Sequence, residues 1–260
     1  MKLAQLLFSQ GFGTRRECAA LVAHGLVEVE GLGSMGDAKC ERRVVDDAEH
    51  ELGDPAGRWF RVRGERWPYH ERALIVLNKP AGYECSLKPR HHPSVYSLLP
   101  APLRHRGVQA IGRLDEDTTG ALLFTDDGAL VHRLTSPKRH VAKVYEVRCK
   151  HAVDTSQIER LLAGVVLHDD HETVRAAACE TSGECGLRLT LKEGKYHQVK
   201  RMVAAVGNRV EGLHRSAFGS VRVEGLATGS WRWANAAADF ANVGPHVQGP
   251  RADQPSQRIG

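Results

Sequence analysis

The chain has 260 residues, of which 42% are hydrophobic and 26% are charged, a balance typical of folded globular proteins and not of disordered ones. This length predicts about two domains. No apolar run approaches the ~20 residues of a membrane span, and arginines follow the N-terminus too closely for a secretory signal, so we expect a cytoplasmic protein that does not enter a membrane. Lysine and arginine total 36 against 31 acidic residues, and this positive charge favours an anionic partner.

The cysteines and histidines do not have the spacing of a metal site. The six cysteines are scattered without a C-x-x-C pair, which argues against a zinc ribbon and against a disulfide framework. His91 and His92 lie near Cys85 among prolines, without ligand spacing. The glycine-rich stretches match neither a phosphate-binding loop nor a dinucleotide fingerprint. We therefore expect neither a metal nor a nucleotide cofactor.

The N-terminal part indicates a small module of two helices and a strand. Apolar residues at helical spacing predict a helix over residues 2–10. Thr14 is expected to cap a second helix over residues 15–24, with Glu17 completing a capping box. Residues 26–30 alternate as a strand. The chain from there to about residue 70 is polar, is interrupted by glycines and shows few clear elements.

From residue 73 onward, helices and strands mix without the regular alternation of a parallel sheet, which favours an α+β fold. We expect strands over residues 73–77, 108–111, 143–147, 187–191 and 220–223. We expect helices over residues 128–135, 155–162 and 196–206. From about residue 236 the chain is polar and rich in proline and glycine, which predicts a disordered tail.

The segment Gly112–Gly120 places one arginine and three acidic residues between an apolar strand and the apolar run at 121–124. Charges between two core segments are unusual, because burying a charge without a partner costs free energy. Two interpretations remain open on the residues alone. The segment is either a polar loop in which Asp117 or Thr118 caps a turn, or a site that uses the carboxylates.

Two further groups of residues have the chemistry of a binding site. In the segment EGKYHQVKRM, a helix would bring His197, Lys200 and Arg201 to one side, where they suit phosphate contacts. A solvated basic face is the alternative interpretation of this pattern. In the strand predicted over 143–147, Lys143 and Tyr145 point to the same side, although a tyrosine in a strand is more often a core residue.

Taken together, these motifs resemble the RsuA-type branch of the ribosomal pseudouridine synthases. The resemblance rests on LNKPAGYECS, GRLDEDTTGALLFTDDG, RLTSPKRHVAKVYEV and EGKYHQVKRMVAAVGNRV, which occur in the family's order over about residues 72–232. The phrases HHPSV, GVVLH and AAVGN are most similar to the enzymes that modify 16S ribosomal RNA. The first ~60 residues resemble the α-L RNA-binding module that this branch often carries.

The resemblance implies the following organisation. A small α-L RNA-binding module and linker would occupy residues 1–65, a catalytic domain residues 72–235, and a disordered tail residues 236–260. The fold class is then α+β, with a mixed, mainly antiparallel sheet and flanking helices in the catalytic domain.

The resemblance also implies an activity and its catalytic residues. The protein would isomerise uridine to pseudouridine in 16S ribosomal RNA without a cofactor. Asp115 would be the nucleophile that acts on a flipped-out base, and Lys200, with Arg201 as the alternative, would keep it ionised. Tyr145 would stack on the target base.

The partner implied is ribosomal RNA, either 16S RNA or a small-subunit assembly intermediate, and the chain is expected to be a monomer. Basic residues along the RNA path would be Lys79, Arg113, Lys143, Lys195, His197 and Arg201 in the catalytic domain, with Arg15 and Arg16 in the N-terminal module.

Three alternative functions remain. The first is a 23S ribosomal RNA enzyme of the same family. The second is a non-catalytic RNA-binding or ribosome-assembly factor, in which Asp115 is merely structural. The third is a D-x-D-x-T phosphatase built on Asp115, Asp117 and Thr119, which is disfavoured because such enzymes need this motif near the start of a regular α/β sheet.

Overall fold

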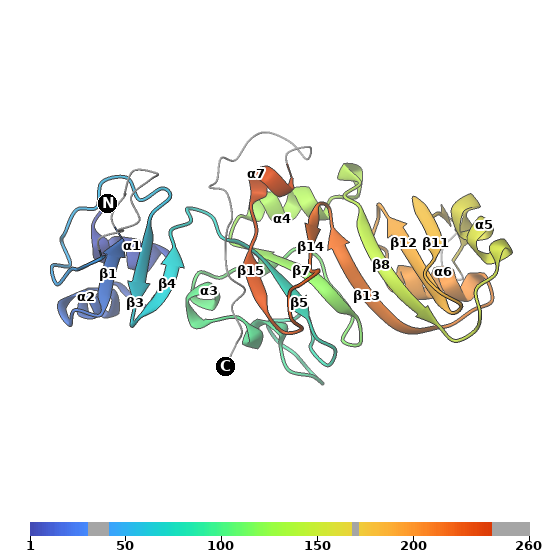
Figure 1. Cartoon of the computed structure of the whole chain (residues 1–260), viewed down its shortest axis with the longest axis horizontal. Helices are drawn as coiled ribbons and strands as arrows, with labels where there is room; N and C mark the ends of the chain where they lie inside the picture. Colours follow the sequence, from blue (N-terminus) through green and yellow to red (C-terminus); the bar gives the residue numbers. More distant parts are fainter. Residues whose placement is uncertain (31–41, 168–171, 241–260) are drawn as a thin grey trace. The chain divides into compact units, whose positions relative to one another are not determined.

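The computed structural model describes three stretches of the chain: residues 1–30, 42–167 and 172–240 (Figure 1). These residues form two compact units. The first unit contains Met1–Ala73 and Leu99–Val108, and the second contains Leu74–Leu98 and the chain from Gln109 onward. None of the described helices combines the length and the apolar character needed to cross a bilayer.

Helices α1 and α2 of the first unit confirm the two predicted helices and their cap. Helix α1 spans Leu3–Ser9, and α2 spans Arg15–Ala23 behind a capping box formed by Thr14 and Glu17. The leucines spaced along one face of α1 are buried, as their helical spacing predicts. The short helix α3, Ala101–His105, belongs to the same unit.

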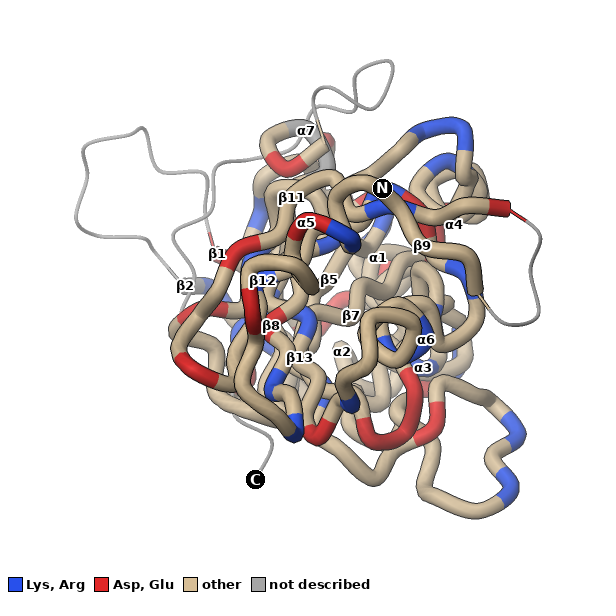
Figure 2. The backbone as a smooth tube through the Cα atoms, turned by 90° about the vertical axis from the view of Figure 1, so that its right-hand side faces the viewer, with Lys and Arg blue, Asp and Glu red and all other residues tan. Residues whose placement is uncertain are grey.

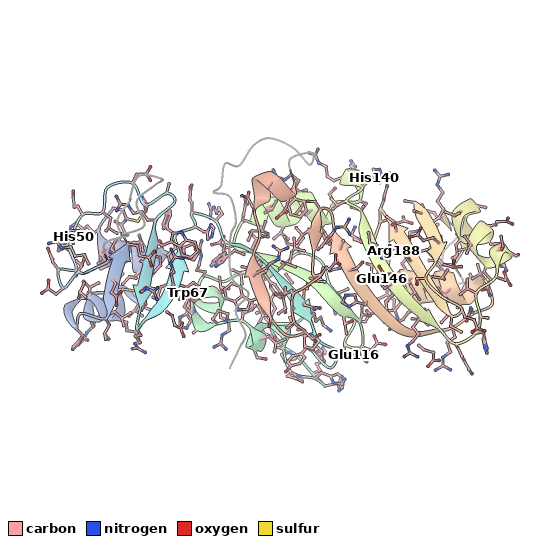
Figure 3. All side chains as sticks on the ribbon, in the orientation of Figure 1. His50, Trp67, Glu116, His140, Glu146 and Arg188 are labelled. Atoms are coloured by element: carbon pink, nitrogen blue, oxygen red, sulfur yellow. The ribbon has the colours of Figure 1, made fainter. Side chains whose placement is uncertain are left out.

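A four-stranded sheet in the order β2-β1-β3-β4 completes the first unit. Its strands are β1 (Val27–Glu30), β2 (Arg42–Val44), β3 (Trp59–Val62) and β4 (Glu65–Pro68). The expectation of few elements up to residue 70 is therefore wrong for the described residues, while residues 31–41 lie outside them. Strands β3 and β4 form because they bury Phe60 and Trp67 (Figure 3), whose rings lie 5.6 and 5.4 Å from that of Phe12.

A nine-stranded sheet forms the centre of the second unit. Its main path runs β11-β12-β8-β13-β7-β5-β15, with β14 beside β13 and β6 beside β7 (Figure 1). Among the described strands, β13 and β7 pair in parallel and the other neighbours in antiparallel fashion. The strands are β5 (Leu74–Lys79), β6 (Gln109–Ala110), β7 (Thr119–Thr125), β8 (Lys143–Cys149), β11 (Ala178–Thr181), β12 (Gly186–Leu191), β13 (Val210–Phe218), β14 (Val221–Arg222) and β15 (Trp231–Trp233). The predicted α+β class with a mixed, mainly antiparallel sheet is confirmed.

Helices and short elements cover this sheet. They are α4 (Gly128–Thr135), α5 (Thr155–Ala163), α6 (Gln198–Ala205), α7 (Ala236–Asp239), the 3₁₀ helices at Val95–Leu98 and Pro137–Arg139, and a two-stranded sheet of β9 (Val165–Val166) and β10 (Thr173–Val174). Helix α6 and strand β8 contribute to one core cluster, in which Val199, Met202 and Val203 lie with Tyr145 and Val147. This packing brings the basic helix beside the strand that carries the tyrosine.

The predicted disordered tail needs a correction at its start. Residues Ala236–Asp239 form α7, and Phe240 behind it is 5% exposed. Its ring lies 6.4 Å from that of Phe218 and joins the core cluster of β5 and β7. Burial of this aromatic side chain provides the free energy that orders the segment. The remainder of the predicted tail, residues 241–260, lies outside the described residues.

Candidate active site

A buried lysine holds the loop that carries Asp115. Lys79 ends β5, is 0% exposed, and its Nζ donates to the carbonyl oxygens of Pro80, Asp115, Glu116 and Thr118 at 2.9–3.1 Å. Glu116 marks this loop in Figure 3. Burial lowers the pKa of Lys79, and the carbonyl dipoles satisfy its donors. The expectation that Lys79 lies on the RNA path is therefore wrong, because a ligand cannot reach it.

The carboxylate of Asp115 is partly exposed and faces two basic side chains. It retains 32% exposure. Its Oδ1 lies 3.3 Å from Nε2 of His197, and its Oδ2 lies 3.5 Å from Nζ of Lys200. The structure thus brings together three of the residues predicted for the site, from segments far apart in the sequence.

Lys200 makes its shortest contacts with Asp117. Lys200 and Arg201 are the two basic residues of α6 (Figure 2), and Nζ of Lys200 donates to both carboxylate oxygens of Asp117, at 2.7 and 2.8 Å. Partial burial alone would lower the pKa of Lys200, but the hydrogen bond and charge of Asp117, followed by those of Asp115, raise it above the ordinary lysine value. Partial burial would likewise raise the pKa of Asp117, and the contact with Lys200 lowers it instead.

The helix that carries Lys200 starts later than the sequence predicts. His197 has a left-handed backbone conformation (φ 47°), so α6 begins at Gln198 and not at Tyr196. Buried Gln198 ties the preceding loop to the helix, because its side chain accepts from the amide of Lys195 at 2.8 Å and donates to Glu193 at 2.7 Å. Tyr196 is 75% exposed and stacks on the His197 ring at 3.8 Å.

One face of the sheet supplies the floor of the site. Lys143 and Tyr145 lie two residues apart on β8 and share a face, and Arg215 on β13 lies directly opposite Tyr145 in the register. Glu146 faces the other side, where its carboxylate accepts from Arg188 Nε at 2.9 Å (Figure 3). Tyr145 is 8% exposed and lines the cavity of the site.

A glycine lets β7 approach β13 beside this floor. Gly120 has φ +105°, and a Cβ there would lie 2.2 Å from the carbonyl oxygen of Arg215, which excludes any side chain. The guanidinium Nε of Arg215 donates to Ala121 O on β7 at 2.7 Å. Arg215 is a residue of the site that the sequence analysis missed. Its signal in the sequence is an arginine within the segment LHRSAF, where no strand was predicted.

A cavity of about 440 Å³ connects these parts. Among its lining residues are seven of the predicted site residues: Arg113, Asp115, Lys143, Tyr145, Lys195, His197 and Lys200. Of the predicted residues in the second unit, Lys79 and Arg201 do not line it. Arg15 and Arg16 belong to the first unit, where they are exposed in the first turn of α2.

Comparisons with known proteins identify the family of the chain. Residues 73–205 match the family model described as RNA pseudouridylate synthase. The chain is 39% identical to the uncharacterized RNA pseudouridine synthase YtzG of Bacillus subtilis over 89% of this chain and 94% of that one. It is 44% identical to the ribosomal small subunit pseudouridine synthase A of Salmonella typhimurium over 63% of this chain and 71% of that one. A crystal structure of a pseudouridylate synthase superimposes with a TM-score of 0.61 at 31% identity, covering 92% of this chain and 97% of that one. The chain therefore belongs to the RNA pseudouridylate synthase family and is an isomerase.

Proposed function

We propose that the protein isomerises uridine to pseudouridine at a site in 16S ribosomal RNA, with Asp115 as the nucleophile. The name of the Salmonella relative supports the small-subunit RNA as substrate. The observation that carries the catalytic assignment is the partly exposed carboxylate of Asp115, which lines one cavity together with Tyr145, Lys200 and His197.

The reaction rearranges one nucleotide without oxidation or reduction. The C1′–N1 bond breaks and its electron pair stays on the uracil. The ring turns, C5 bonds to C1′, the C5 proton leaves, and N1 takes up a proton, so that the formula is unchanged. The Asp115 carboxylate acts as nucleophile either at C6 of the base or at C1′ of the sugar, and both routes use its free oxygen lone pairs. Lys200 and His197 orient the carboxylate through their contacts of 3.5 and 3.3 Å.

The target uridine has to leave its stack before it can reach Asp115. Extrusion of a base costs a few kcal/mol. The cavity volume of about 440 Å³ falls in the range of small-molecule sites, and the ring of Tyr145 inside it offers a stacking surface. Arg113 is exposed two residues before Asp115, where it suits a neighbouring phosphate or the space that the base leaves.

The first unit is proposed to add RNA affinity. Arg15 and Arg16 are exposed at the beginning of α2, and helix N-termini bind phosphate through their free amides. The Arg15 guanidinium lies 4.6 Å from the centre of the Phe8 ring, itself 41% exposed, so the two side chains form an exposed surface for a sugar–phosphate backbone. We extend this role to residues 1–65, the predicted RNA-binding module.

The loss of the C5 hydrogen gives a direct assay. Transcripts of 16S and 23S ribosomal RNA are labelled with tritium at C5 of uridine and incubated with the purified protein, and tritium released into water is counted. The expected result is release from 16S RNA at a stoichiometry near one per transcript, with no release from 23S RNA.

The other outcomes overturn specific parts of the proposal. Release from 23S RNA alone would keep the isomerase and reject the small-subunit substrate. Release from neither RNA, including RNA assembled with small-subunit proteins, would reject ribosomal RNA as the substrate and favour the binding-factor alternative if both RNAs are still bound.

A further inference from the structure

Two cationic side chains lie at the floor of the cavity, and neither forms an ion pair among the described residues. Lys143 and Arg215 both line the cavity, and the ring of Phe218 lies beside them, with its centre 5.4 Å from Lys143 Nζ and 5.3 Å from the Arg215 guanidinium carbon. Among the ion pairs of the described residues, neither cation takes part in one.

The hydrogen bonds of these cations leave donors unused. Nζ of Lys143 donates to Val141 O at 3.0 Å, and Nε of Arg215 donates to Ala121 O at 2.7 Å. Arg215 is 2% exposed, and within the described residues its Nη2 is buried without a hydrogen-bond partner. If Arg215 served only to join β13 to β7, its Nε hydrogen bond would be explained, but the buried Nη2 without a partner would not.

Like charges gathered in a poorly solvated cavity are unfavourable unless an anion completes the site. The electrostatic surroundings of Lys143 illustrate this. Burial, followed by the charge of Arg215, lowers the pKa of Lys143 to about 8, and the opposing charge of Glu193 has a smaller effect than either. The acidic residue at the reaction centre does not serve as that anion, because Asp115 faces His197 and Lys200.

We propose that Arg215 and Lys143 bind the carbonyl oxygens of the target uracil and stabilise the negative charge that moves onto the ring when the C1′–N1 bond breaks. The proposal rests on the proposed function. Arg215 lies opposite Tyr145 in the strand register, so a base stacked on that ring has its polar edge within reach of the guanidinium.

The negative charge that these cations would stabilise comes from the nucleotide itself when the C1′–N1 bond breaks. Cleavage leaves the electron pair of the C1′–N1 bond on N1, from which it spreads to the O2 and O4 carbonyl oxygens. Donors aimed at oxygens where charge develops favour the transition state over the ground state. An electron pair of the ring then forms the C5–C1′ bond, the C5 proton leaves and N1 takes up a proton, so the ring is neutral again and the two cations are unchanged after each turnover.

The test compares Arg215→Gln and Lys143→Met with Arg222→Gln, which removes one exposed charge on β14 outside the cavity. Single-turnover tritium release from C5-labelled 16S RNA reports chemistry, and filter binding of the same RNA reports affinity. We expect Arg215→Gln to slow release by about 100-fold or more and to change the dissociation constant by less than about threefold. Lys143→Met should act in the same direction, and Arg222→Gln should match the wild type.

The pH profile of release provides a second readout that a structural role would not change. The wild-type rate should fall as pH rises through about 8, where Lys143 loses its charge. The other charged groups that act on Lys143 are Arg215 and Glu193. Lys143→Met should lack this alkaline decline. Thermal melting and circular dichroism of each variant establish that it is folded, and if Arg215→Gln unfolds, Arg215→Lys replaces it, with a smaller loss expected.

The outcomes separate this proposal from the function on which it rests. A folded Arg215→Gln variant with the rate of Arg222→Gln would overturn the proposal, as would a loss in RNA affinity as large as the loss in rate. A wild-type protein that releases no tritium from 16S RNA would contradict the proposed function instead.

Discussion

Lys200 is held by Asp117 more closely than by the proposed nucleophile. Its Nζ donates to both carboxylate oxygens of Asp117, at 2.7 and 2.8 Å, whereas Oδ2 of Asp115 lies 3.5 Å away. Asp117 therefore determines the position of the Lys200 ammonium group, while the Asp115 carboxylate remains 32% exposed. This arrangement gives the acidic residues of the GRLDEDTTG segment different tasks.

Replacement of Lys200 and Asp117 should have unequal effects. Lys200→Met removes the cation beside Asp115 and should lower the single-turnover rate by about 100-fold. Asp117→Asn keeps Lys200 but weakens the hydrogen bonds that hold its ammonium group. This change should lower the rate by about tenfold, equivalent to a barrier higher by ~1.4 kcal/mol. Rates are measured by tritium release, with the exposed Glu224→Gln as the matched control. A larger loss in Asp117→Asn than in Lys200→Met would contradict this division of roles.

The Tyr145 ring and its hydroxyl group can be separated by two substitutions. Tyr145→Phe keeps the stacking surface and should lower the rate by about 100-fold if the phenol oxygen assists removal of the C5 proton. Tyr145→Leu removes the ring as well and should lower the rate further. Pseudouridine yield over time is the measurement, with melting temperatures as the folding control. Wild-type activity of Tyr145→Phe would limit the residue to stacking.

Burial of Lys143 should be visible in the pH dependence of stability. Burial and the charge of Arg215 lower its pKa to about 8, whereas in the unfolded chain it is ~10.4. Between these values the unfolded state binds more protons, so the contribution of Lys143 to stability rises with pH. Lys143→Met should therefore melt at a higher temperature than the wild type at pH 7, and the difference should shrink from pH 8 to pH 10. A difference in melting temperature that widens from pH 8 to pH 10 would contradict this prediction.

Removal of charge at the start of α2 should weaken RNA binding without slowing chemistry. The double substitution Arg15→Gln and Arg16→Gln removes two exposed charges of the first unit. Neutralised phosphates release counterions, so the slope of log affinity against log salt should fall by up to about two. Filter binding at several salt concentrations measures this slope, and the single-turnover rate at saturating protein should stay unchanged. An unaltered slope would remove these residues from the RNA interface.

Local signals made several elements predictable from the sequence. The capping box at Thr14 and the leucine spacing of α1 act within one helix, and both appear as expected. The motifs around Asp115 and Lys200 also led to residues that share one cavity. In these cases interactions between residues close in the sequence, or motifs in a fixed order, were enough to predict the structure.

Features that depend on tertiary contacts were missed. The β3–β4 turn uses Arg63 and Gly64 at positive φ, and Arg63 gives no hairpin signal of the Asn-Gly kind. Strand β13 shows no apolar alternation in the sequence, and its pairing with β8 and β7 places Arg215 at the cavity. Lys79 looked like a binding residue, since the sequence does not indicate that four carbonyl oxygens surround it.

The most direct test of the central claim concerns Asp115 in cells. Pseudouridines in 16S and 23S ribosomal RNA are mapped by carbodiimide modification and primer extension in a strain without the gene, complemented with wild type or with Asp115→Asn. The account predicts that one 16S site is lost, that the wild type restores it, and that Asp115→Asn, although folded and still able to bind RNA, does not. Restoration of the site by Asp115→Asn would contradict the assignment of Asp115 as the nucleophile.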